Sequence, residues 1–287
     1  MVFDKESAFE EAVVTVLKQH GWDDAEGVLR YPTEQDLIDN WAKILFNNNA
    51  GIDRLNGCPL TQGEMAQIIE QIETLKTPLA LNGFINGKTV AITRDNPNDT
   101  LHLGKEVSLK IYDRQEIAAG QSRYQIAQQP IYPAKSKILN DRRGDLCLLI
   151  NGMPVIHIEL KRSGVPVSQA TGQIEKYAHE GVFTGLFRLV QIFVGRTPDE
   201  ARSFANPGAG AFNPNFFFHW EDFNNEPVCA GDKRGTDEWK RFTSTLLSIP
   251  MAHQLIGFYT VADSSDGCLK VMRSYQYYAA AAISDKV

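Results

Sequence analysis

The sequence lacks the features of a secreted, membrane-spanning or disulfide-rich protein. It has only four cysteines, none of them in a C-x-x-C pair, at positions Cys58, Cys147, Cys229 and Cys268. Scattered cysteines indicate neither a zinc site nor a disulfide framework, and they favour a reducing cytoplasm. No apolar run approaches the length that spans a bilayer, and residues 1–5 are too polar to begin a secretion signal. We therefore expect a cytoplasmic protein that does not bind membranes.

Positive charge is also scarce, because the net charge of the chain is −6. A nucleic-acid-binding protein needs clustered lysine and arginine, so the overall balance argues against that class. The local distribution differs, since residues 135–162 carry six basic side chains and only three acidic ones. The basic residues are Lys135, Lys137, Arg142, Arg143, Lys161 and Arg162, and the acids are Asp141, Asp145 and Glu159. Charge alone favours a solvated surface here, but a metal-dependent nuclease would need the same mixture.

The phosphate-binding loop G-x-x-x-x-G-K-[ST] is missing as well, so we expect no ATP site of that kind in this chain. With 287 residues, the chain is long enough for one large domain or two small ones. Hydrophobic residues make up 43% and charged residues 22%, which are ordinary values for a globular protein.

The hydrophobic periodicity predicts helices and strands in alternation. We expect helices over residues 6–18, 33–45, 61–75, 167–179 and 236–247, with Thr61 and Glu64 as a capping box. We expect strands over residues 89–93, 107–112, 124–127, 146–150, 154–160, 189–194 and 216–220. The polar segment 206–215 is predicted to be a loop. The pattern predicts an α/β protein with a mixed central sheet flanked by helices.

Two of the predicted strands form a hairpin that brings charged residues together. Asn151-Gly152 is the strongest short hairpin signal, and it joins the strands 146–150 and 154–160. Asp145 begins one strand, while Glu159 and Lys161 lie one residue apart at the end of the other. Alternate strand residues point to one face at a spacing of roughly 6.5 Å. Two carboxylates and an ammonium can therefore meet at one point, and carboxylate oxygens suit Mg²⁺.

A bare E-x-K pattern is more often a structural Glu–Lys pair than a catalytic one, because short patterns recur freely. The wider context changes that estimate. Gln173 and Tyr177 follow on a predicted helix at i and i+4, so they share one face that can look toward the carboxylates. The alternative for this helix is that Tyr177 packs in the core and Gln173 is simply exposed.

The segment from Asp145 to Lys161, followed by Gln173-Ile-Glu-Lys-Tyr177, resembles the nuclease motif of the restriction (motor, R) subunit of type I restriction-modification enzymes. This family belongs to the PD-(D/E)xK nuclease superfamily, and the Q-x-x-x-Y helix distinguishes this branch. Gly144 replaces the proline of the superfamily motif, which supplies no ligand. Weaker similarities cover residues 6–10, 202–206 and 271–279, so the resemblance touches most of the chain.

The resemblance implies a restriction-endonuclease-like core and a set of residue roles. It implies that Asp145 and Glu159 bind Mg²⁺, that Lys161 acts on the attacking water or the scissile phosphate, and that Glu10 assists the site. Gln173 and Tyr177 would position the DNA. Gln276 would read the adenine of ATP, which we expect to bind only in the full-length protein.

The same resemblance predicts the domain organisation and the partners. We expect a nuclease domain over residues 1–260, helical over about 1–80 and catalytic over about 85–220. Residues 261–287 would lead into a helicase motor, so the chain is expected to be an N-terminal fragment. The expected partners are double-stranded DNA and the modification and specificity subunits of the restriction complex.

Two other functions stay open at this stage. One is a non-catalytic DNA-docking or regulatory module that keeps the nuclease-like fold. The intact Asp, Glu and Lys set favours the enzyme, because a module that only binds has no reason to bury this combination. The other is a stand-alone repair or resolvase nuclease, and the motor-like segment near Gln276 argues against it.

Overall fold

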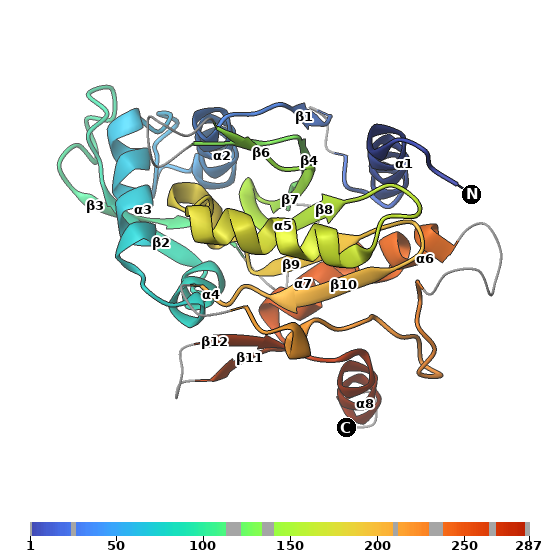
Figure 1. Ribbon diagram of the computed structural model, residues 1–287. Helices are drawn as coiled ribbons and strands as arrows, with labels where there is room; N and C mark the ends of the chain where they lie inside the picture. Colours follow the sequence, from blue (N-terminus) through green and yellow to red (C-terminus); the bar gives the residue numbers. More distant parts are fainter. Residues whose placement is uncertain are drawn as a thin grey trace.

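A mixed six-stranded sheet forms the centre of the molecule, with helices on both faces (Figure 1). The structure is a computed structural model that describes residues 2–23, 27–112, 122–133, 141–208, 212–229, 238–263 and 268–284. The helices of these regions are α1 (Glu6–Gln19), α2 (Glu34–Asn49), α3 (Gln62–Thr74), α4 (Pro78–Asn86), α5 (Val167–Glu180), α6 (Glu238–Thr245), α7 (Ile249–Gly257) and α8 (Ser274–Ser284), with short 3₁₀ helices η2 (Gly185–Leu189) and η3 (Pro214–Phe216). No helix among them is long and apolar enough to cross a membrane.

The central sheet has the strand order β1-β4-β7-β8-β9-β10. Its strands are β1 (Leu29–Arg30), β4 (Tyr124–Gln128), β7 (Leu146–Ile150), β8 (Met153–Leu160), β9 (Ile192–Arg196) and β10 (Ala201–Ala205). The pairs β1–β4 and β8–β9 are parallel, and the other neighbours are antiparallel. Three small two-stranded sheets lie beside it, formed by β2 (Thr89–Thr93) with β3 (Glu106–Lys110), β5 (Ile131–Tyr132) with β6 (Arg142–Arg143), and β11 (Thr260–Asp263) with β12 (Cys268–Val271).

The β7–β8 hairpin has the predicted turn. Asn151 and Gly152 both have positive φ, at 51° and 83°, as a two-residue type I′ turn requires. A Cβ atom on Gly152 would lie 2.9 Å from the Trp41 backbone, so α2 packs directly against the turn. Every residue of β7 and β8 is buried. The hairpin is therefore the centre of the sheet, as its largely apolar sequence predicts.

Neighbouring residues at the end of β9 show which helices cover which face. Gly195 faces α5, because a Cβ atom there would lie 2.8 Å from Thr171 Cγ2. Arg196 points to the opposite face, where its guanidinium donates to the Trp239 carbonyl and to Thr243 Oγ1 in α6, both at 2.7 Å. The α5 helix thus covers one face of the sheet, and α6 covers the other.

Most of the predicted elements are confirmed, including the α/β class and the Thr61–Glu64 capping box of α3. One predicted strand, 216–220, is wrong: the chain there forms η3 and a single bridge between Ser203 and Phe218. The predicted strand at 189–194 begins only at Ile192, because Leu189 still belongs to η2 and residues 190–191 connect the two elements. Part of the predicted loop 206–215 and residues 236–237 of the last predicted helix lie outside the described residues.

Candidate active site

The register of the β7–β8 hairpin sets Asp145 opposite Glu159. Cys147 pairs with His157, and Leu146 pairs with Ile158, so the next position places the two carboxylates across from each other. Asp145 Oδ2 accepts a hydrogen bond of 2.7 Å from the backbone N–H of Leu160. Glu159 pairs with Gly195 on its other side and therefore points toward α5. The sequence-predicted convergence of the two carboxylates is confirmed.

The two carboxylates differ in exposure. Glu159 is fully buried, whereas Asp145 is partly exposed, so the pair opens to solvent on the side of Asp145. Burial raises the pKa of Glu159 to about 8, against the opposing influence of Lys161. Burial, and then the neighbouring charge of Glu159, raises the pKa of Asp145 well above its usual range. Two acids held together out of water favour the binding of a cation.

Neither carboxylate oxygen of Glu159 makes a hydrogen bond of good geometry among the described residues, although the Asp145 backbone and the His157 ring lie close to it. A proton shared with the carboxyl of Asp145 would give Glu159 its partner there. Buried carboxylates are normally paired, hydrogen-bonded or bound to a metal, so these oxygens fit a cation. No group of three or more His, Cys, Asp or Glu side chains is placed to hold a metal in the described regions. Two carboxylates suit an ion such as Mg²⁺, which keeps several of its waters.

Lys161 completes the predicted set of three. It follows the last residue of β8, and its backbone N–H donates to the Arg196 carbonyl at 2.9 Å. Its ammonium lies 3.3 Å from Glu6 Oε1 in α1 and donates to the Leu160 carbonyl at 2.8 Å. The charge of Lys161 acts on both Asp145 and Glu159, and it opposes the rise in the pKa of each.

The helix α1 contributes two glutamates near the site, of which only Glu10 was predicted. Glu10 is buried, and its carboxylate accepts hydrogen bonds from the side-chain amides of Gln128 (2.7 Å) and Gln129 (3.1 Å). Glu6, one turn earlier, is the residue that contacts Lys161. The i, i+4 spacing of Glu6 and Glu10 on one helix face is the sequence signal that could have identified Glu6.

Gln173 and Tyr177 lie on α5 and contact each other. Gln173 Nε2 donates to the Tyr177 hydroxyl at 2.7 Å, and that hydroxyl donates to the carbonyl of Arg143 at 2.8 Å. Tyr177 is only 6% exposed. The structure therefore does not support a direct DNA contact by its hydroxyl, because the group is committed to the backbone two residues before Asp145. Tyr177 instead anchors the segment that leads into the site.

Sequence reasoning missed a histidine and a tyrosine behind Glu159. His157 is fully buried on the same strand face, with Nε2 3.1 Å from Glu159 Oε1 and Nδ1 2.7 Å from the Tyr132 hydroxyl. Burial lowers the pKa of His157 to about 4, so the ring is neutral. The spacing His-x-Glu-x-Lys along one strand could have identified His157, whereas no local pattern points to Tyr132.

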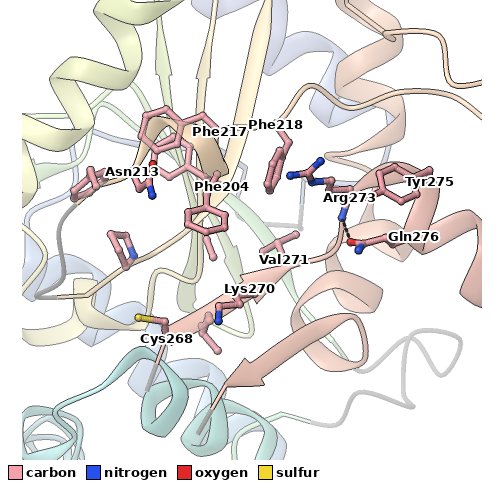
Figure 2. Close-up of a pocket in the computed structure, with 15 residues that line it drawn as sticks. Phe204, Asn213, Phe217, Phe218, Cys268, Lys270, Val271, Arg273, Tyr275 and Gln276 are labelled. Carbon is pink, nitrogen blue, oxygen red and sulfur yellow. Dashed lines mark hydrogen bonds between the residues drawn. The ribbon is translucent and has the colours of Figure 1, made fainter. Parts of the chain in front are cut away.

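Gln276 belongs to a separate cavity of about 580 Å³ between β10, η3 and β12 (Figure 2). Its lining includes the aromatic rings of Phe204, Phe217 and Phe218. Gln276 is exposed near the start of α8, and its side-chain oxygen accepts from the backbone N–H of Arg273 at 3.0 Å. The structure thus places Gln276 apart from the carboxylate pair, on an element that follows the sheet.

Comparison with known proteins identifies the family. The family model described as the type I restriction enzyme R protein N terminus matches residues 4–211. The chain is 29% identical over 283 residues to the endonuclease subunit of a type I restriction enzyme from Staphylococcus saprophyticus, and 27% identical over 287 residues to one from Staphylococcus aureus. Each alignment covers 99% of this chain and 27% of the relative.

A third relative is the endonuclease subunit of the type I restriction enzyme EcoprrI from Escherichia coli, which is 27% identical over 280 residues. That alignment covers 92% of this chain and 82% of the relative. The chain spans about a quarter of the length of its staphylococcal relatives. The family match covers the hairpin, the carboxylate pair and α5, so this chain belongs to the family of N-terminal regions of type I restriction enzyme R proteins.

Proposed function

We propose that this chain is the metal-dependent nuclease domain of a type I restriction subunit, with a PD-(D/E)xK core, and that it hydrolyses phosphodiester bonds in DNA. The observation that carries the proposal is the carboxylate of Glu159, which is fully buried opposite Asp145 and makes no hydrogen bond of good geometry within the described residues. A purely structural acid at the centre of a sheet would be paired, because burying an unpaired carboxylate costs several kcal/mol. The names of the relatives, all endonuclease subunits, support the same activity.

In this proposal Asp145 and Glu159 bind Mg²⁺. The bound ion would polarise the scissile phosphate and lower the pKa of a water molecule. Leu160 fixes Asp145 through its backbone N–H, so the carboxylate is oriented before the ion arrives. The partly exposed side of Asp145 gives the phosphate a way to approach.

Lys161 supplies the positive charge of the site. Its ammonium stabilises negative charge on the phosphate or positions the attacking water, and Glu6 holds it in place at 3.3 Å. Glu10 acts at a greater distance, since its carboxylate binds Gln129, whose backbone N–H donates to the Asp145 carbonyl at 2.7 Å. We assign Glu10 to the outer shell of the site. Gln173, which is partly exposed and uses only its amide nitrogen in the contact with Tyr177, is proposed to position the DNA.

The longer relatives suggest how the domain is used. We infer that residues 1–260 form the nuclease domain and that residues 261–287 lead into an ATP-driven motor that translocates DNA. Gln276 would contact the adenine of ATP in the longer protein. The inferred partners are double-stranded DNA and the modification and specificity subunits, because the relatives are subunits of type I restriction enzymes.

Cleavage of DNA by the restriction complex that carries this chain tests the proposal. We expect cleavage with Mg²⁺ and none after chelation. Asp145→Ala, Glu159→Ala and Lys161→Ala should each reduce the rate by at least about a hundredfold without loss of the fold. Glu175→Gln removes a partly exposed carboxylate from α5 and is the matched control. Cleavage by Glu159→Ala at the wild-type rate would overturn the proposal. A wild-type complex that binds DNA but does not cleave it would favour a non-catalytic docking module.

A further inference from the structure

Two residues with unusual backbone conformations lie side by side next to Asp145. Tyr31 has φ 55° and Gln129 has φ 52°, a left-handed region that large side chains rarely occupy. They follow the parallel strands β1 and β4 directly, and the Tyr31 N–H donates to the Gln128 carbonyl at 2.8 Å. The N–H of Gln129 donates to the Asp145 carbonyl at 2.7 Å. This strained pair is therefore hydrogen-bonded into the segment that carries a site carboxylate.

The Tyr31 side chain is open to solvent, since 52% of this residue is exposed. A left-handed conformation costs a non-glycine residue roughly 1–2 kcal/mol. The exposed ring offsets little of that cost by burial. Strained residues of this kind cluster at functional sites, where the position of a side chain matters more than stability.

Arg143 lies against the Tyr31 ring, with its guanidinium carbon 5.5 Å from the ring centre. Its guanidinium is exposed and makes a long hydrogen bond of 3.4 Å to the side-chain oxygen of Gln129. No carboxylate pairs with Arg143 in the described part of the chain, whereas its neighbour Arg142 binds Glu180 at 2.7 Å. Within the described residues, Arg143 is thus a cation without a paired carboxylate, two positions from Asp145.

The backbone of Arg143 is fixed on the buried side. Its carbonyl accepts from the Tyr177 hydroxyl, and β6 pairs with β5 through Ile131. The backbone of Arg143 is therefore fixed, its guanidinium stacks on the Tyr31 ring, and no carboxylate among the described residues pairs with its charge. A planar guanidinium in this state suits bidentate recognition of a phosphate group.

We propose that Tyr31 and Arg143 form a DNA-binding site that takes a backbone phosphate beside the one being cut. Arg143 donates to the phosphate oxygens, and Tyr31 holds the guanidinium by stacking. The proposal deepens the proposed function, because it places DNA at the carboxylate pair. It also gives Tyr177 an indirect role, since Tyr177 fixes the main chain of the residue proposed to make the contact.

Binding of a fluorescein-labelled duplex to the 287-residue chain in Ca²⁺, measured by fluorescence anisotropy, tests the proposal without cleavage. Arg143→Gln should raise the Kd about tenfold at low salt. It should also reduce the slope of log K against log salt by about 1, the value for one lost phosphate contact. Tyr31→Asn, which tolerates the left-handed backbone, should weaken binding without lowering the Tm, while Tyr31→Phe keeps the ring and should bind as the wild type does.

Arg241→Gln and Phe223→Asn are the matched controls. Arg241 is a partly exposed arginine in α6, and Phe223 is an aromatic residue that is 76% exposed. Both controls should bind DNA with the wild-type Kd. An unchanged Kd and salt slope in Arg143→Gln would overturn the proposal, and so would a chain that does not bind the duplex. The nuclease assignment has a separate test. It fails if the protein binds DNA through Arg143 but does not cleave it.

Discussion

His157 and Glu159 lie on the same face of β8, with the imidazole Nε2 3.1 Å from the carboxylate Oε1. Their relative orientation leaves both atoms without a hydrogen bond, although both are buried. On the other side of the ring, the Tyr132 hydroxyl lies 2.7 Å from Nδ1. A hydroxyl that donates to Nδ1 places the imidazole proton on Nε2, facing Glu159. In that tautomer the ring can donate to the carboxylate after a small rotation, and it limits the positions that Glu159 can take.

Replacement of His157 by phenylalanine should weaken metal binding. The aromatic ring keeps the packing against Phe183 and Phe193, but it removes the potential donor to Glu159. Loss of such an outer partner typically lowers metal affinity by about 10–100-fold. Titration of Mn²⁺ by calorimetry measures the effect without DNA.

Tyr132→Phe is the companion variant. It removes the hydroxyl that hydrogen-bonds to Nδ1 of His157 and leaves the imidazole in place. We expect a smaller loss of Mn²⁺ affinity than in His157→Phe. Equal metal binding by His157→Phe and the wild type would mean that the histidine only fills space.

Tyr177→Phe should reduce stability more than DNA binding. The lost hydroxyl connects Gln173 to the Arg143 carbonyl inside the protein, and a buried hydrogen bond contributes about 1 kcal/mol. We expect a lower Tm and slower cleavage, because the segment before Asp145 loosens. If DNA affinity falls while the Tm stays the same, the hydroxyl contacts DNA after all.

Gly195→Ala should disturb the site through packing alone. A Cβ atom there would lie 2.8 Å from Thr171 Cγ2 and 3.0 Å from the Thr171 backbone nitrogen, so α5 must move away from β9. Overpacking of this kind costs about 1–3 kcal/mol. Since Gly195 pairs with Glu159, cleavage should fall together with the Tm.

Gly172→Ala is the control on the same helix. No atom lies within 4 Å of a Cβ at this exposed position, and alanine favours the helix by about 1 kcal/mol. A rise in the Tm of this variant beside a fall for Gly195→Ala would locate the effect at the contact between helix and sheet.

The sequence predicted the hairpin and its charged residues because each signal there is local. Asn151-Gly152 determines the turn, and a fixed turn sets the register that places Asp145 opposite Glu159. Tyr132 and Tyr31 could not be predicted in the same way, since they reach the site from other strands. Their positions depend on strand order, which the alternation of polar and apolar residues does not encode.

The errors have the same origin. Residues 216–220 have the composition of a strand, but β10 is the last strand of the sheet, and only Phe218 pairs with it. Glu6 was missed for the same reason, because Glu6 and Glu10 share one helix face and only the tertiary packing of α1 decides which of them meets Lys161.

Acid should destabilise the protein through His253. This residue is buried in α7, where its ring stacks on Tyr112 and its Nδ1 lies 2.9 Å from the Tyr112 hydroxyl. Burial lowers its pKa from 6.5 to about 4, so the unfolded chain binds a proton more readily than the folded one. Stability is then complete above pH 6.5 and declines as the pH falls from there toward 4, by up to about 3 kcal/mol.

His157 follows the same rule, since burial also lowers its pKa to about 4. The two residues can be separated by urea unfolding of His253→Phe at pH 7 and pH 5. Phenylalanine cannot take up a proton, so this variant should lose less stability between the two pH values than the wild type does. A wild-type pH dependence in His253→Phe would show that this histidine is not responsible, and the decline would then be assigned to His157 or to other groups.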